Sequence, residues 1–123
     1  MGMIPIINMK NLGYLFINAT KTNKITFQLK KLKQITIYNF SNYGVHTISD
    51  LNFLENIKNI KALNLTRVHL QLSHVNFVNL KKLNCENCKY IKNRDIENLI
   101  NLEVLCLFHS PNITNDAFRK LKK

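Results

Sequence analysis

Leu80-Lys-Lys-Leu83-Asn-Cys85 begins the stretch that decides the fold, with apolar residues at its first, fourth and sixth positions. The same pattern occurs in four other places along the chain. These copies are Leu12-Gly-Tyr-Leu15-Phe-Ile17, Leu32-Lys-Gln-Ile35-Thr-Ile37, Ile60-Lys-Ala-Leu63-Asn-Leu65 and Leu102-Glu-Val-Leu105-Cys-Leu107. Their starts at 12, 32, 60, 80 and 102 are separated by 20, 28, 20 and 22 residues. The alternation within each copy is typical of a short strand with one buried face.

This spacing resembles that of leucine-rich-repeat proteins, whose repeats are about 20–29 residues long. It predicts a single domain over residues 1–123 with about five repeats. The predicted fold class is α/β: a leucine-rich-repeat solenoid with a short parallel β-sheet on the concave side and helices or irregular turns on the convex side. The predicted core contains the inward strand residues Leu15, Ile17, Ile35, Ile37, Leu63, Leu65, Leu83, Cys85, Leu105 and Leu107.

The segment after each strand also follows a pattern. The position three residues beyond the last apolar residue usually carries a side chain that hydrogen-bonds the turning backbone. Cys88 fits this role, and Ser110 is a polar residue at the equivalent position. Thr20, Phe40 and Val68 fit this position less well, so we expect the first three turns to be less regular.

Return segments follow these turns. Residues 95–99 and 116–121 place acidic residues early and apolar residues at a spacing of three, which favours short helices. Residues 49–54 show a similar pattern, with Ser49 as the expected N-cap. The extra length of the 28-residue copy falls in the turn-rich segment 41–47, which we expect to form a loop.

Two stretches carry a closer family resemblance. Cys85-Glu-Asn-Cys88-Lys-Tyr-Ile91-Lys-Asn-Arg-Asp95-Ile96-Glu-Asn-Leu99 and Ser110-Pro-Asn-Ile113-Thr114-Asn115-Asp116-Ala-Phe-Arg-Lys-Leu121 resemble the cysteine-containing leucine-rich repeats of F-box proteins. The resemblance covers residues 80–121 well, 29–79 moderately and 1–28 poorly. In that family the repeats recognise substrates for a ubiquitin ligase, and a separate F-box recruits the ligase. We find no F-box in this sequence, so the resemblance implies protein recognition, as in a substrate-recognition adaptor, and not ubiquitin transfer.

The strand positions between the inward residues should form the concave face, because side chains alternate along a strand. We expect this face to bind a partner protein. The candidate partner-binding residues are Tyr14, Phe16, Gln34, Tyr38, Asn64, Asn84, Glu86 and Phe108. Aromatic residues, which often anchor interfaces, stand at both ends of this row, and the middle is rich in amides. The alternative is that terminal segments or neighbouring rows partly shield Phe16 and Phe108.

A zinc site is the chemical alternative. Cys85-x-x-Cys88 and Cys106-x-x-His109 form two candidate ligand pairs, a type of spacing that zinc sites use. The apolar pattern opposes this interpretation, since Cys85 takes an inward position whereas Cys106 is one position out of phase. We therefore expect two buried thiols and one exposed thiol, with no metal ion and no cofactor.

The net charge of +11 raises the alternative of nucleic-acid binding. Lysines recur just before the strands and would form a basic edge that a phosphate backbone could follow. These are Lys30, Lys31, Lys33, Lys58, Lys61, Lys81, Lys82, Lys120, Lys122 and Lys123. The frequent Asn, Ile and Lys also match a bias towards A/T-rich codons, in which case the edge is only a solvated surface.

Several function classes are not supported by motifs in the sequence. The first apolar run, Ile4-Pro5-Ile6-Ile7, is far shorter than the roughly 20 residues that cross a bilayer. Polar residues interrupt it, so we expect no signal peptide and an intracellular location with free thiols. There is no Walker loop, dinucleotide fingerprint or hydrolase elbow, so we expect no enzyme. The last copy ends at residues 119–123 without a polar cap, which makes self-association through that end an alternative to concave binding.

Overall fold

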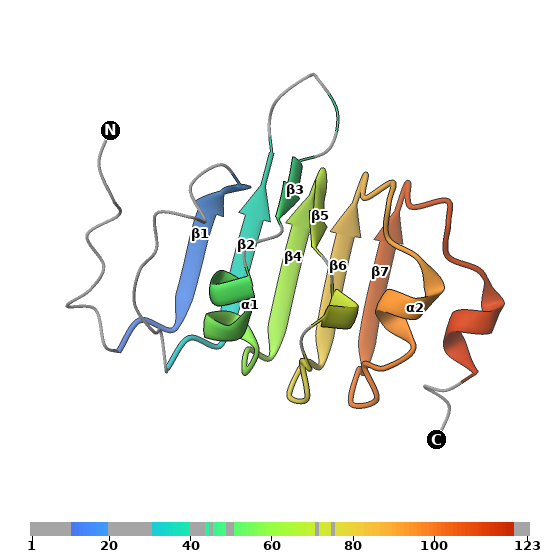
Figure 1. Cartoon of the computed structure of the whole chain (residues 1–123). Coiled ribbons are helices and arrows are strands. Elements are labelled where there is room, and N and C mark those ends of the chain that lie inside the picture. The colour runs from blue at the N-terminus through green and yellow to red at the C-terminus, as the bar shows by residue number, and fades with distance from the viewer. Residues whose placement is uncertain are drawn as a thin grey trace.

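Five short strands form one parallel sheet, in the order β1-β2-β4-β6-β7 (Figure 1). The computed structural model describes residues 11–19, 31–39, 44, 46–48, 51–70, 72–74 and 76–119. The strands are β1 (Tyr14–Asn18), β2 (Gln34–Tyr38), β4 (Ala62–Thr66), β6 (Lys82–Glu86) and β7 (Val104–Phe108). Each strand begins two residues after one start of the apolar pattern, so each copy contributes one strand. The predicted parallel sheet is confirmed.

The register of the sheet aligns equivalent positions of successive copies, as Ile35 of β2 and Leu63 of β4 illustrate. Neighbouring strands are also linked just before they begin. The Lys33 carbonyl accepts hydrogen bonds from the backbone N–H groups of Lys61 (2.7 Å) and Ala62 (3.1 Å). The same arrangement joins each of the other neighbouring pairs in this sheet. These links hold the strand starts in line and therefore stack the residues that precede the strands.

Alternate side chains of the strands are buried against the core. In the three central strands the inward residues are at most 2% exposed, namely Ile35, Ile37, Leu63, Leu65, Leu83 and Cys85. Ile17 of β1 is also buried. Leu15, Leu105 and Leu107 are only half-buried, which corrects the prediction that all ten inward residues are core residues. They belong to β1 and β7, each of which has a strand on one side only within the described sheet.

Short helices lie on one face of the sheet, which is the near face in Figure 1. They are α1 (Leu51–Ile57), the 3-10 helix η2 (Leu72–His74), α2 (Asn93–Ile96) and the 3-10 helix η3 (Asn115–Phe118). The predicted α/β class is confirmed by these helices and the parallel sheet. Each predicted return helix overlaps an observed one, but α2 ends at Ile96, so residues 97–99 of the predicted range 95–99 are not helical. Ser49, the expected N-cap, lies outside the described residues, and so do the turn positions Thr20 and Phe40.

Helix α2 illustrates how an acidic residue stabilises a short return segment. The Asp95 carboxylate accepts a hydrogen bond from the backbone N–H of Lys92 at 2.9 Å. Asp95 is nevertheless 4% exposed, so this bond compensates part of its lost hydration. The side chain of Asn93 is bonded to Thr114 in the next segment, from Nδ2 to Oγ1 at 2.7 Å. The return segments are therefore linked to each other as well as to the sheet.

A second, two-stranded parallel sheet joins β3 (His46–Ile48) to β5 (Val68–Leu70). The sequence pattern predicts a loop over 41–47, and this prediction is wrong at His46 and Thr47, which belong to β3. Residues 41–43 and 45 lie outside the described residues. Strand β5 follows β4 after one residue, Arg67, whose φ of 54° turns the chain sharply. Val68 and Leu70 then bury their side chains in the core, as Ile48 does from β3. The short alternation of apolar residues over Val68–Leu70, which follows the main strand, therefore forms a strand of its own.

None of the helices in the described ranges has the length and apolar character needed to cross a membrane.

Candidate functional site

The candidate site is the face of the main sheet opposite the buried core, called the open face below. It consists of the first, third and fifth residues of each strand. These are Tyr14, Phe16, Asn18, Gln34, Thr36, Tyr38, Ala62, Asn64, Thr66, Lys82, Asn84, Glu86, Val104, Cys106 and Phe108. All are half-buried or exposed. The structure thus brings all eight predicted partner-binding residues onto one surface.

Aromatic side chains gather on β1 and β2. The rings of Phe16 and Tyr38 lie 4.7 Å apart between centroids and are tilted by 33°. Phe16 is 55% exposed, and Tyr14 beside it is 47% exposed. Phe108 on β7 is 61% exposed, and Phe16 is shielded in part by the Tyr38 ring of the neighbouring strand. Large apolar surface therefore remains accessible at both ends of the open face.

The polar middle of the open face is ordered by hydrogen bonds across strands. The Tyr14 hydroxyl and Thr36 Oγ1 lie 2.9 Å apart, at hydrogen-bond distance. Asn64 Nδ2 donates to the same Thr36 oxygen at 3.1 Å. Side chains that are already held in place lose less conformational entropy when a partner binds. These two hydrogen bonds hold the side chains of Tyr14, Thr36 and Asn64 in one row across three strands.

At the other end, residues of β6 and β7 line a shallow cavity that is open to solvent. It is lined by Asn84, Glu86, Cys106, Leu107 and Phe108. Glu86 lies directly opposite Phe108 in the parallel register, so a carboxylate and an aromatic ring are neighbours. The His109 ring meets the Phe108 ring nearly at right angles, with centroids 4.5 Å apart. The sequence identified Glu86 and Phe108 separately, and only the register pairs them.

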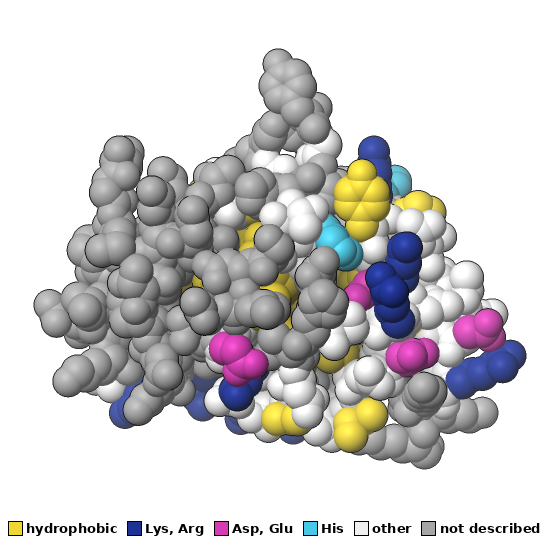
Figure 2. Space-filling model, in the orientation of Figure 1, with side chains coloured by type: hydrophobic (Ala, Val, Ile, Leu, Met, Phe, Trp, Pro, Cys, Tyr) yellow, Lys and Arg dark blue, Asp and Glu magenta, His cyan; other side chains and the backbone are white. Residues whose placement is uncertain are grey.

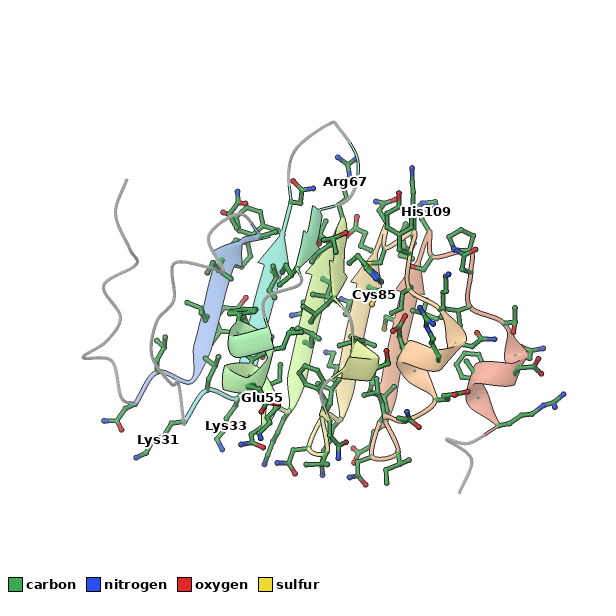
Figure 3. The ribbon with its side chains drawn as sticks, in the orientation of Figure 1. Lys31, Lys33, Glu55, Arg67, Cys85 and His109 are labelled. Atoms are coloured by element: carbon green, nitrogen blue, oxygen red, sulfur yellow. The ribbon has the colours of Figure 1, made fainter. Side chains whose placement is uncertain are left out.

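The cysteines are arranged as the apolar pattern predicts. Cys85 and Cys88 are buried, whereas Cys106 is exposed on the open face. Cys85 lies on the core side of β6 and Cys106 lies on the open face of β7, so the sheet separates the two thiols. Together with His109 at the strand-end edge (Figure 3), these residues do not converge on one point. No group of three or more His, Cys, Asp or Glu residues with metal-binding geometry occurs in the part of the chain that the structure describes.

Cys88 occupies the turn position for which the sequence indicates a backbone-bonding side chain. Its thiol lies 3.7 Å from the Leu65 carbonyl and 3.5 Å from the Glu86 carbonyl, and donates to these oxygens. The hydrogen bond with Cys88 and burial in the core raise the pKa of the Cys85 thiol well above its ordinary value. Cys85 is therefore a protonated core residue at neutral pH. Ser110 stands at the position equivalent to Cys88, and its buried hydroxyl has no hydrogen-bond partner within the described structure.

The lysine-rich edge lies where the strands begin. Lys31, Lys33, Lys61, Lys81 and Lys82 are exposed there, and Figure 3 shows the first two at the lower edge. Dark-blue basic side chains are also visible along this edge in Figure 2. The other predicted members, Lys30, Lys120, Lys122 and Lys123, lie outside the described residues.

Ion pairs alter the charge of this edge. Lys81 Nζ lies 3.4 Å from Glu103 Oε2, and Lys58 Nζ lies 2.9 Å from Glu55 Oε2. Lys33 and Lys61 remain stacked on adjacent strands without a carboxylate partner within the described ranges. Two lysines of this edge, Lys58 and Lys81, are therefore partly neutralised by neighbouring carboxylates.

Asn39 is a structural residue that the sequence interpretation missed. It is 6% exposed, and its Nδ2 donates to the carbonyls of Gly44 (3.1 Å) and Arg67 (3.3 Å). The pattern assigns this role to Phe40, one residue later. An asparagine immediately after a strand was the available signal, because its short amide readily bonds a turning backbone.

The strand ends share a backbone feature. Arg67, Asn87 and His109 occupy the same position in their copies, and all three have φ between 54° and 56°. Such left-handed residues are uncommon outside glycine, although Asn and His tolerate them better than most. Each of them ends a strand in a sharp turn, and this turn directs the following residue towards the core.

His69 on β5 is a second feature without a sequence signal. Its Nδ1 is buried without a hydrogen-bond partner in the described structure, and its ring meets that of Tyr90 edge-on at 5.8 Å. Burial lowers the pKa of His69 below 6.5, partly opposed by nearby Asp95 and reinforced by Arg94 and Lys92. The neutral imidazole is therefore the form that this environment stabilises.

No protein-family model matches the chain, and no curated protein matches it in sequence. The resemblance to F-box leucine-rich repeats therefore stays a prediction from the residues. Self-association also stays a prediction. β7 is the last strand of the described sheet, and the half-burial of Leu105 and Leu107 marks that end as less covered than the centre.

Proposed function

We propose that this chain is a leucine-rich-repeat solenoid that binds a partner protein on its open face, which is the concave face in such a fold. Five copies of one apolar pattern, each contributing one strand in the same register, support the solenoid. Each copy buries its apolar side only by stacking on its neighbours, which is the physical basis of repeat architectures. The binding face is then the regular surface that the stacked strands present together.

The observation that carries the binding function is the exposure of aromatic side chains on this regular surface. Tyr14, Phe16 and Phe108 keep 47%, 55% and 61% of their surface exposed on the face opposite the core. Aromatic residues dominate binding energy at protein interfaces, because they bury a large area with few rotatable bonds. The amide-rich middle supplies hydrogen-bonding groups of the kind that adapt to a partner.

We propose a recognition role and not a catalytic one. The outward strand positions mainly carry aromatic, amide and hydroxyl side chains. The resemblance to F-box repeats supports substrate recognition as the type of task, and the proposal extends no further than binding. The partner is expected to engage both ends of the open face, because the exposed aromatic residues stand at both ends.

Affinity capture from the cells that express this protein tests the proposal. The full chain is compared with two variants, Phe16→Ala/Tyr38→Ala at one end and Phe108→Ala at the other. Both variants should lose the same captured protein while keeping the wild-type melting temperature. Phe118→Ala is the matched control, because Phe118 is 42% exposed but lies on η3, away from the open face. Equal capture by all folded variants would contradict the proposal, and loss of a second copy of this chain would favour self-association.

A second candidate function is nucleic-acid binding by the lysine-rich edge. The observation that favours it is the backbone link between strand starts, which places Lys33, Lys61 and Lys81 in one row. Strands stand about 4.8 Å apart, so the row forms a closely spaced line of positive charge. Such a line binds phosphates with a strong dependence on salt, which separates this candidate from the first.

A further inference from the structure

We propose that the cavity between β6 and β7 binds an arginine side chain of the partner protein, an inference that rests on the proposed function. The cavity brings together a carboxylate, a primary amide and an exposed phenyl ring, from Glu86, Asn84 and Phe108. The cavity is shallow and open to solvent, so a long side chain can lie across both strands.

The Glu86 carboxylate determines which charge a bound partner group must carry. Glu86 is the one acidic residue among the open-face positions, and no ion pair within the described ranges involves it. A neutral or apolar group placed over Glu86 would remove water from the carboxylate without replacing it, which is unfavourable. A cation replaces that hydration with a charge-assisted hydrogen bond. The partner group over Glu86 is therefore a cation.

The Phe108 ring distinguishes between the two cationic side chains, arginine and lysine. The ring lies directly opposite Glu86 across the β6–β7 pair, and the His109 ring packs against it at 4.5 Å. A guanidinium stacks on an aromatic face while its planar N–H groups bond a neighbouring carboxylate in two places. An ammonium group carries the same charge but is more strongly hydrated and has no planar fork. The pairing of Glu86 with Phe108 therefore favours arginine over lysine.

The large positive charge of the chain does not prevent this contact. Lys82 is the basic residue of the open face, four residues before Glu86 on the same strand. Four strand residues span roughly 13 Å, which is longer than the screening distance of about 8 Å at physiological salt. At that ionic strength the short-range attraction of Glu86 and Phe108 dominates over the repulsion from Lys82.

The experiment uses the ¹⁵N-labelled full chain at physiological salt. It is titrated with N-acetyl-arginine amide, with the lysine analogue, and with the uncharged isostere N-acetyl-citrulline amide. The arginine probe should shift the amide resonances of Asn84, Glu86, Cys106 and Phe108 in a saturable way. Citrulline should not shift them, and the lysine analogue should bind more weakly.

Two substitutions identify the contacts. Glu86→Gln should weaken arginine binding by about two- to fivefold, the loss expected for a solvent-exposed ion pair. Phe108→Leu should weaken it by about threefold through the lost ring face. Glu103→Gln is the matched control, because it removes the same charge at the other end of the β7 segment, where Glu103 pairs with Lys81. It should leave arginine binding unchanged.

Several results would overturn the inference: shifts scattered over the whole surface, equal binding of citrulline, lysine binding as tightly as arginine, or equal effects of Glu86→Gln and Glu103→Gln. The inference and the proposed function fail in different ways. If arginine binds at Glu86 but Phe16→Ala/Tyr38→Ala still captures the partner, only the proposed function fails. If that double variant loses the partner while Glu86→Gln retains it and arginine does not bind, only the arginine site fails.

Discussion

Cys85 and Cys106 lie one register step apart on neighbouring strands, and their thiols project to opposite faces of the same sheet. Leu107 stands opposite Cys85, whereas Cys106 stands opposite Asn84. The first thiol is at 0% exposure in the core, and the second is exposed beside the cavity at Glu86. A shift of one residue along a strand is enough to separate them, because successive side chains point to opposite faces.

Thiol titration checks this register. In the native protein a reagent such as 5,5′-dithiobis(2-nitrobenzoate) should modify Cys106 rapidly, because a thiol must be accessible and ionised to react. Cys85 and Cys88 should react only after unfolding, when all three cysteines of the sequence become accessible. Cys106→Ser should remove the rapid phase. Rapid modification of Cys85 in folded protein would contradict the assigned strand phase.

Core substitutions should have unequal effects along the sheet. Leu83→Ala should lower the free energy of unfolding by about 2–5 kcal/mol, because Leu83 is fully buried in a central strand. Leu105→Ala on β7 should cost less, since Leu105 is half-buried. Denaturant unfolding of the two variants measures the difference. Equal losses would show that β7 is as well covered as β6.

Asn39→Ala should destabilise the protein by about 1–3 kcal/mol, because it leaves two acceptors, the carbonyls of Gly44 and Arg67, without this donor. Asn84→Ala is the matched control. Its amide is exposed on the open face, so the change should stay within about 0.5 kcal/mol. Thermal unfolding of both variants gives the comparison. A neutral effect of Asn39→Ala would remove Asn39 from the structural residues.

His69 should make stability depend on pH. Burial lowers its folded pKa below 6.5, so the unfolded chain binds a proton at a higher pH than the folded protein does. The contribution of neutral His69 to the free energy of unfolding is therefore fully present above pH 6.5. It is lost as the pH falls from there towards the lowered pKa. Unfolding free energies at about pH 7.5 and about pH 5.5 measure the slope. His69→Gln should flatten it, and an unchanged slope would contradict the assignment.

The lysine-rich edge predicts a salt-dependent interaction if it is functional. Binding of a short RNA or DNA should weaken steeply with salt, by a slope of about 0.9 for each phosphate contact on a duplex. Lys33→Glu/Lys61→Glu/Lys81→Glu should abolish it without unfolding the chain. Lys89→Glu/Lys92→Glu/Arg94→Glu is the control, with the same change of charge away from the strand starts. Equal losses in both variants would attribute the binding to net charge alone.

The apolar pattern by itself determined where the five strands of the main sheet lie and on which face of the sheet each side chain stands, but not that Leu15, Leu105 and Leu107 are only half-buried. Ile35, Leu63 and Leu83 are core residues because alternation along a strand assigns each side chain to one face before any contact is known. The same reasoning placed Cys106 and the aromatic residues on the open face. It could not place β3 and β5, because a three-residue alternation inside a return segment is too short to be distinguished from a turn.

Only the tertiary structure decided which side chains meet across the strands. Glu86 and Phe108 are 22 residues apart in the sequence, and the parallel register makes them neighbours. Asn39 donates a hydrogen bond to the carbonyl of Arg67, which is 28 residues away in the sequence. The pattern assigns this backbone-bonding role to Phe40 instead. The physical reason is that periodicity along one chain determines the face on which a residue lies, whereas cross-strand contacts depend on the length and path of the segments between the strands.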